Sequence, residues 1–188
     1  MHSKERLKRG NILISQPFGG GDLFHRSVVL LISCSQEGSM GLVLNKPAEG
    51  ELHSYLDLEL TMLSFKVGKG GPMEEDRLFV LHSGVYDIMD SEHVKPDLYI
   101  GGDIDVIFNK MYKREIDSEH LRFFLGYAGW SRGQLEEEIE AGQWIVKDAD
   151  TADIMNKYVG DATWSDLLQS IGGEYAQWAA YPDDPRFN

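Results

Sequence analysis

The sequence is poor in several features that define large classes of proteins. Its 188 residues include a single cysteine, Cys34, which excludes an internal disulfide and a metal cluster built from thiolates. The longest apolar run, residues 28–32, falls far short of the roughly 20 residues that a membrane-spanning helix needs. The basic residues near the N-terminus are not followed by the apolar stretch of a secretion signal. We therefore expect a cytoplasmic protein without a membrane span.

Positive charge is also scarce. The chain has 18 Lys and Arg against 31 Asp and Glu, which gives a net charge of −13 at pH 7. Residues 1–9 are basic, so the remainder is more acidic still. Nucleic-acid binding depends on Lys and Arg that neutralise phosphates, and direct binding to DNA is therefore not expected. The partners that the charge leaves open are another protein and an anionic small molecule.

Recognisable catalytic and metal-binding motifs are missing. There is no HExxH, no paired-cysteine motif and no Asp-x-Asp calcium loop, and the six histidines lack ligand spacing. No GxSxG elbow accompanies any serine. Gly19, Gly20 and Gly21 could cradle a phosphate only before a helix, and we expect a strand there. The sequence therefore predicts no metal, no cofactor and no assignable catalytic residue, which favours a non-enzymatic protein.

The pattern of apolar residues predicts one α+β domain over residues 10–180, with mobile ends at 1–9 and 181–188. Helices are expected at 52–58, at 104–113 with Asp103 as N-cap, after a capping box of Ser131 and Gln134, and from Thr163 to a break at Gly172. Residues 148–153 read as an acidic loop. The expected fold is a single compact domain with a mixed, largely antiparallel sheet, open or barrel-like, surrounded by helices. Strands are expected at residues 11–15, 26–34, 40–45, 65–67, 78–82, 98–101, 121–127 and 143–146.

Three separated segments join buried strands to glycines and polar residues. They are GSMGLVLNKP at 38–47, GGPMEEDRLFVLH at 70–82 and LGYAGWSRGQLEEEI at 125–139. Together they resemble the AlgH/YqgE family of small bacterial proteins, over nearly the whole chain. The resemblance implies a non-enzymatic regulatory or interaction protein, described in the family as a transcriptional regulator, and it implies no reaction. Given the charge, such regulation is expected to act indirectly rather than through DNA binding.

The alternative is a small-molecule or nucleotide-binding protein, or a hydrolase, with a pocket at the strand ends. Arg26 offers an anion anchor or the partner of a structural carboxylate, and Ser27 shares a strand face with His25. Asn45 and Lys46 end the first segment's strand, where Pro47 is expected to stop the hydrogen-bond ladder. For each of these residues, a purely structural role is an alternative to ligand binding.

The remaining pocket candidates come from the other two segments. Gly70 and Gly71 could expose backbone N–H groups to an anion. Arg77 either binds a ligand or neutralises its acidic neighbours, and His82 could titrate near physiological pH or be satisfied at the rim of the sheet. Two aromatic residues and a glutamine could form a binding face or pack a tight strand-to-helix turn. These last three are Tyr127, Trp130 and Gln134.

Overall fold

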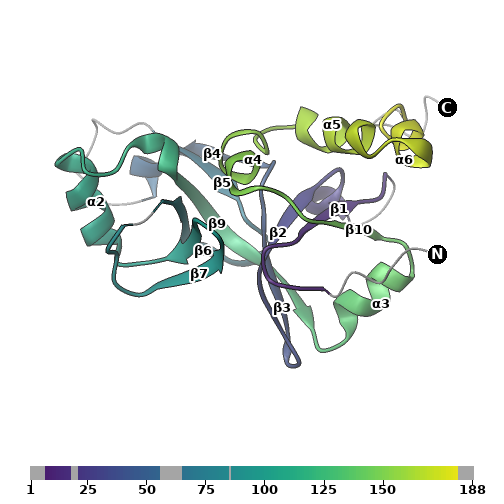
Figure 1. Cartoon of the computed structure of the whole chain (residues 1–188), viewed down its shortest axis with the longest axis horizontal. Helices are drawn as coiled ribbons and strands as arrows, with labels where there is room; N and C mark the ends of the chain where they lie inside the picture. Colours follow the sequence, from purple (N-terminus) through teal and green to yellow (C-terminus); the bar gives the residue numbers. More distant parts are fainter. Residues whose placement is uncertain (1–6, 18–20, 56–64, 85, 182–188) are drawn as a thin grey trace.

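The structure, a computed structural model, describes residues 7–17, 21–55, 65–84 and 86–181 (Figure 1). Of the two ends expected to be mobile, 1–6 and 182–188 lie outside the described residues, as do 56–58 of the expected helix at 52–58. The strands are β1 (Ile12–Ser15), β2 (Val28–Ser35), β3 (Gly38–Val43), β4 (Pro47–Glu51), β5 (Lys66–Lys69), β6 (Met73–Ser83), β7 (Ser91–Lys95), β8 (Leu98–Gly101), β9 (Leu121–Ser131) and β10 (Trp144–Lys147). The helices are α1 (Gly21–Phe24), α2 (Ile104–Tyr112), α3 (Gln134–Glu140), α4 (Thr151–Asn156), α5 (Ala162–Ile171) and α6 (Gly173–Trp178), with 3-10 turns η1 (Leu52–Ser54) and η2 (Ser118–His120).

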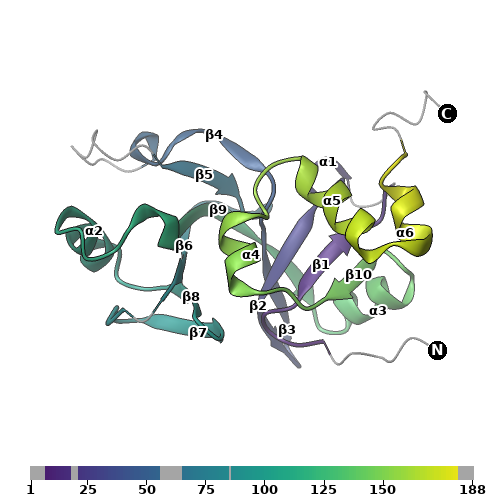
Figure 2. The ribbon, with the colours of Figure 1, turned by 45° about the horizontal axis from the view of Figure 1, so that its top comes forward.

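All ten strands belong to one curled sheet (Figures 1 and 2). Its main path runs β10-β1-β2-β3-β9-β6-β8-β7, while β4 pairs with β5 and β5 with β9. The β5–β9 pair is parallel, and the other pairs are antiparallel. The predicted α+β class with a mixed, largely antiparallel sheet is confirmed.

Strand β9 changes its neighbours along its length. Residues 123–125 lie between β5 and β6, and residues 128–131 pair with β3. Gly126 stands between the two parts with φ +67°, a backbone conformation that only glycine adopts without cost. A Cβ there would lie 2.5 Å from the carbonyl oxygen of Gly71. The glycine therefore lets one strand serve both halves of the sheet.

Helices cover both faces of the sheet, which explains why several strands are apolar throughout. On one side, Ile12, Ile14 and Leu30 pack with Trp164 and other residues of α4 and α5. The alternate residues of the same strands, such as Leu13 and Val29, face α3 and the indoles of Trp130 and Trp144. A third cluster joins β5, β6 and the start of β9 to α2 (Figure 2). No helix in the described part of the chain is long and apolar enough to cross a membrane.

Several local predictions are confirmed. Asp103 caps α2, because its Oδ1 accepts from the backbone N–H groups of Asp105 at 2.9 Å and Val106 at 3.1 Å. Lys110 lies in the last turn of that helix and Lys113 is its C-cap residue, and positive charge stabilises this end of a helix. Glycine 172 separates α5 from α6.

Other predictions are wrong, for identifiable reasons. Pro47 does not end pairing: it begins β4, an edge strand in which its missing N–H costs no ladder bond. Gly21, the last residue of the glycine run, begins the short helix α1 where a strand was expected. The acidic stretch at 148–153 already contains the first turn of α4. Thr163 lies inside α5 and is buried, whereas Asp161 is the N-cap residue.

The expected end of one strand and the expected start of one helix were also mistaken. β9 runs through Ser131, and α3 begins only at Gln134 after Gly133 in a left-handed conformation. Half of the expected capping box exists, because the Gln134 side chain accepts from the Ser131 backbone N–H at 3.0 Å. Strand β7 was not predicted; it is mostly polar and lies at the end of the sheet. Edge strands need no apolar run, so their pattern is weak.

Candidate functional site

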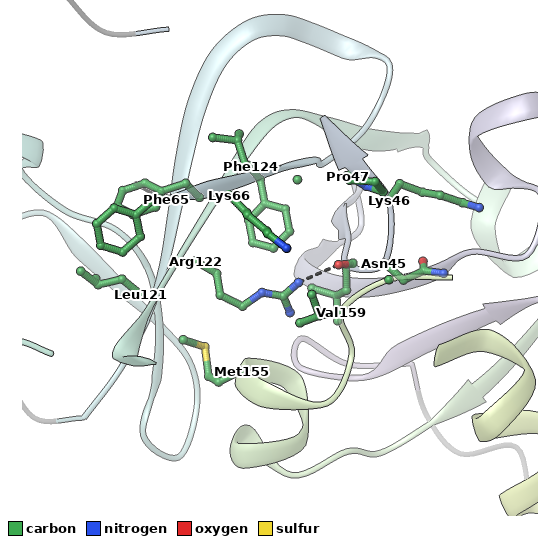
Figure 3. Close-up of a pocket in the computed structure, with 15 residues that line it drawn as sticks. Asn45, Lys46, Pro47, Phe65, Lys66, Leu121, Arg122, Phe124, Met155 and Val159 are labelled. Atoms are coloured by element: carbon green, nitrogen blue, oxygen red, sulfur yellow. Dashed lines mark hydrogen bonds between the residues drawn. The ribbon is translucent and has the colours of Figure 1, made fainter. Parts of the chain in front are cut away.

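A cleft of about 460 Å³ opens between the β4–β5 pair, the first half of β9 and the segment that joins α4 to α5 (Figure 3). This volume lies within the range of roughly 300–1,000 Å³ that small-molecule sites occupy. The lining comes from residues 44–47, 65–68 and 121–124, and from Met155, Val159 and Gly160. Four chain segments that are distant in sequence therefore meet here.

Arg122 lies in the middle of the cleft (Figure 3). In β9, Leu121 and Phe123 face the α2 cluster, and Phe124 faces the opposite core. Because side chains alternate along a strand, Arg122 shares the side of Phe124, and its guanidinium lies 5.0 Å from the centre of that ring. Strand alternation thus places a cation in the second position of an otherwise apolar run.

The guanidinium of Arg122 is bound by backbone oxygens. Its Nη1 donates to the carbonyl of Ile154 at 2.5 Å, and its Nη2 donates to those of Leu44 at 2.6 Å and Tyr158 at 3.2 Å. These bonds tie the C-terminal end of α4 to the end of β3. Carbonyl oxygens are dipoles and do not cancel the positive charge. Within the described residues, no carboxylate forms an ion pair with Arg122.

Burial has a measurable consequence for this charge. Loss of hydration lowers the pKa of Arg122 from its ordinary value to about 10, because a low-dielectric environment disfavours the charged form. The residue remains protonated at neutral pH, but its charge is less stable there than in water. An anion in the cleft would supply the missing compensation.

Two lysines add to the positive charge. Lys66 extends from β5 toward the guanidinium of Arg122 (Figure 3), and it forms no ion pair within the described part of the chain. Lys46 lies at the other end of the cleft, 4.0 Å from Asp161, and points away from Arg122 (Figure 3). Like charges that converge repel each other, so Lys66 and Arg122 together favour a bound anion.

Most of the other lining side chains are apolar. Phe65 and Leu121 lie together on one side of Arg122, and Met155 lies below them (Figure 3). Val159 borders the guanidinium from the loop after α4 and is 57% exposed. The amide of Asn45 is already engaged: its Oδ1 accepts from Val28 N–H and its Nδ2 donates to Arg26 O, both at 2.9 Å.

Among the candidates from the sequence, Asn45 and Lys46 line the cleft. Arg26 and Ser27 do not. The guanidinium of Arg26 lies 4.9 Å from the centre of the Trp164 ring and donates to Tyr181 O. Ser27 is fully buried and donates to the carbonyl of Phe24 at 3.0 Å. The shared strand face expected for His25 and Ser27 is absent, because β2 begins only at Val28 and Arg26 has φ 49°.

Gly70 and Gly71 permit a close approach of two chain segments. A Cβ on Gly70 would lie 2.2 Å from Gly126 O, and one on Gly71 would lie 1.9 Å from the carbonyl carbon of Tyr127. The Gly70 N–H donates to Leu125 O at 2.7 Å, so it is not offered to an anion. Both glycines thus have a packing role against β9.

Arg77 and His82 lie on β6 but outside the cleft. Arg77 pairs with Glu74 at 2.9 Å on the exposed part of the strand. His82 is only 1% exposed, stacks on Tyr99 and shares a 2.9 Å hydrogen bond between its Nε2 and Ser91 Oγ. Burial lowers the pKa of His82, since an imidazolium would lose its hydration there.

The third predicted group forms a network of its own. Trp130 Nε1 donates to Glu138 Oε2 at 2.9 Å, and Gln134 Nε2 donates to Glu138 Oε1 at the same distance. Trp144 Nε1 also donates to Oε2, at 2.8 Å. Tyr127 packs edge-on against Phe79 on the sheet. These contacts give the group a structural role, and they lie away from the cleft lining.

The sequence reasoning missed Arg122, Lys66 and the apolar wall. The signal for Arg122 was present, because it interrupts the buried run LRFFL at a position that faces the interior. A metal is not favoured by the geometry: within the described ranges, no group of three or more His, Cys, Asp or Glu could hold one. The site offers three cations, of which Lys66 and Arg122 are neighbours, and an apolar surface.

Comparison with known proteins identifies the family. Residues 12–176 match the family model described as AlgH-like. A UPF0301 protein of Cytophaga hutchinsonii is 39% identical over 97% of this chain and 100% of its own length. One from Bacteroides thetaiotaomicron is 37% identical over 96% of this chain and 91% of its own.

Two solved structures have the same fold. The solution structure of the AlgH protein from Pseudomonas aeruginosa has a TM-score of 0.72 and 25% identity, covering 97% of this chain and 98% of that one. A crystal structure of a protein from Corynebacterium diphtheriae has a TM-score of 0.77 and 20% identity, covering 95% of both chains. The three segments, the curled sheet and these matches agree: the chain belongs to the AlgH-like family.

Proposed function

We propose that this AlgH-like chain is a non-enzymatic binding protein that takes an organic anion in the cleft around Arg122. The observation that carries the proposal is the convergence of Lys66 and Arg122 in an apolar cleft without a carboxylate partner among the described residues. Two neighbouring cations raise the local positive potential even though the whole chain carries −13. A bound anion would lower the free energy of that arrangement.

The composition of the lining supports binding rather than catalysis. Its ionisable side chains are Lys46, Lys66 and Arg122. General acid–base catalysis works best with a group whose pKa lies near the operating pH, and the pKa of Arg122, lowered by burial to about 10, is still well above neutral pH. The buried Ser27, expected from the sequence as a candidate, donates to a backbone carbonyl instead of a base.

Regulation, which the family resemblance implies, would then follow from ligand binding. We propose that the occupied and empty forms differ in how they contact another protein, and that DNA is not contacted directly. The support for this is the net charge of −13, which repels an anionic duplex. A gel-shift assay at about 150 mM salt tests it: tight, sequence-dependent retention of duplex DNA would overturn the indirect route.

Thermal shift with the purified full chain tests the binding proposal. The ligands are octanoate, benzoate, citrate, inorganic phosphate, AMP and ATP at millimolar concentration. A ligand at a hundred times its Kd adds about 2.7 kcal/mol, which for a chain of this size raises Tm by roughly 5–10 °C. At least one anion is expected to do so. If none of them changes Tm, the proposal fails.

A pair of lysine substitutions locates the site. Lys66 and Lys69 are both exposed residues of β5, but only Lys66 lines the cleft. Lys66→Gln is expected to weaken anion binding about fivefold, the effect of losing an interaction of about 1 kcal/mol. Lys69→Gln changes the net charge equally and is expected to leave the affinity unchanged. Equal effects of the two substitutions, measured by titration calorimetry, would show that the anion binds elsewhere.

A further inference from the structure

The cleft is divided into a charged part and an apolar part. Lys66 and Arg122 meet in its middle, and Phe124, Met155 and Val159 lie around them on the same side of the sheet (Figure 3). An inorganic anion would meet the cations but would leave most of a volume of about 460 Å³ unfilled. A ligand that uses the whole cleft therefore needs an anionic group and a body that matches the apolar side.

The hydrogen-bonding groups of the lining narrow the nature of that body. Recognition of a sugar or a nucleobase requires side chains with unused donors and acceptors. Asn45 contributes the one carboxamide of the lining, and both ends of its amide are engaged by Val28 N–H and Arg26 O. The guanidinium Nη atoms of Arg122 already donate to backbone carbonyls. The described lining therefore provides positive charge for an anionic head group, but few unused hydrogen-bonding groups that could bind polar groups on the body of the ligand.

The apolar side is suited to a flexible chain. Val159 and Phe124 provide branched and aromatic surface, and Met155 adds an unbranched thioether that adapts to irregular shapes. Each methylene group removed from water contributes a constant increment to affinity. Lys46, which points away from Arg122 and lies near Asp161, is left out of the head-group contact.

We infer that the ligand is an amphipathic anion: its carboxylate or phosphate head lies between Lys66 and Arg122, and its alkyl or acyl chain lies against Phe124, Met155 and Val159. The inference rests on the proposed function, because it specifies the ligand of the same cleft. It places fatty acids and alkyl phosphates in one class, since both pair a single anionic head with an aliphatic chain.

A chain-length series tests the inference. The affinity of the full chain for acetate, butanoate, hexanoate and octanoate is measured by titration calorimetry at constant pH and ionic strength. Affinity is expected to rise about fourfold for each added methylene, which is the effect of about 0.8 kcal/mol per buried group. Octyl phosphate compared with octanoate distinguishes the two head groups, and octanol provides a neutral body without a head.

Val159 offers a substitution that does not disturb the core. It is 57% exposed and borders Arg122, so Val159→Glu would place a carboxylate beside the guanidinium and compete with the ligand head. Octanoate affinity is expected to fall at least tenfold. Met89→Glu is the control, because Met89 is 69% exposed and outside the lining, and it is expected to bind octanoate like the unmodified chain.

The outcomes separate this inference from the proposed function. If citrate, phosphate or AMP binds with dependence on Lys66 while affinity does not rise with chain length, anion binding stands and the amphipathic ligand is overturned. If octanol binds as tightly as octanoate, the anionic head is overturned. If affinity rises with chain length but Lys66→Gln and Val159→Glu have no effect, the site is overturned. If no anion binds, both proposals fail.

Discussion

Glu138 holds two buried indoles together, and its removal gives a sharp test of the packing role assigned to the third sequence segment. Its Oε2 accepts from Trp130 Nε1 at 2.9 Å and from Trp144 Nε1 at 2.8 Å, and its Oε1 accepts from Gln134. The tryptophans are 7% and 8% exposed, so water has little access to replace a lost acceptor. We predict that Glu138→Ala strongly destabilises the fold.

The magnitude follows from these contacts. A hydrogen bond to a charged group contributes about 1.5–3 kcal/mol, and the partial exposure of Glu138 favours the lower value. Loss of two such bonds gives about 3 kcal/mol, a large part of a total stability of roughly 5–15 kcal/mol. Glu138→Gln keeps an oxygen for the indoles but turns an amide N–H toward the Gln134 amide. A loss of about 1 kcal/mol in the free energy of unfolding is expected for this variant.

Urea unfolding followed by tryptophan fluorescence measures these differences. Glu137→Ala is the control, because Glu137 is exposed on the same helix, and only a few tenths of a kcal/mol are expected from its interaction with the helix dipole. The expected order of loss is Glu138→Ala, then Glu138→Gln, then Glu137→Ala. The reasoning is refuted if Glu138→Ala costs no more than Glu137→Ala, since the indole N–H groups would then not depend on the carboxylate.

Three further predictions concern the scaffold. Gly71→Ala is expected to lower the free energy of unfolding by about 3 kcal/mol or more, because its Cβ would lie 1.9 Å from the Tyr127 backbone. Gly133→Ala is the control: its Cβ meets open space at φ +78°, and a loss of about 1 kcal/mol is expected. Equal melting temperatures of the two variants would contradict this. Burial lowers the pKa of His82 below its ordinary 6.5, so the unfolded chain takes up a proton first as pH falls through 6.5. The free energy of unfolding is therefore expected to decline by up to about 1.4 kcal/mol per pH unit. His82→Gln should flatten the dependence of stability on pH between pH 7 and 5, and an unchanged slope would exclude His82 as its source. Asp103→Ala removes the α2 cap and should lower the free energy of unfolding, measured with urea, by about 1 kcal/mol. An unchanged free energy of unfolding would contradict this and would mean that water replaces the carboxylate.

Local pattern was sufficient for much of the fold. The apolar runs that became β1, β2 and β10 stand out because helices cover both faces of these strands. The cap at Asp103 is read from neighbouring residues alone. Local pattern was not sufficient at Pro47 and Thr163. Pro47 lies in an edge strand, which tolerates a proline, and Thr163 is a buried helix residue that resembles an N-cap in sequence. Only the tertiary arrangement distinguishes these alternatives.

The cleft depended even more on tertiary structure. Asn45 and Lys46 were found because they follow a strand, but the cleft itself requires three further segments to meet them. Arg122 was hidden in an apolar run, and its partners Ile154 and Tyr158 lie more than thirty positions away. The sequence contains the charge, while the lack of a carboxylate beside it is a property of the folded chain.

Strand β9 has a consequence for how the chain can be divided. It pairs with β3, β5 and β6, and its Arg122 also binds the end of α4. A fragment that ends before residue 121 would keep three strands that lack their common neighbour, and the remaining piece would keep that neighbour without the other three. Non-local pairing of this kind slows folding. The cleft therefore requires the assembled sheet, and it could not be transplanted as a separate module.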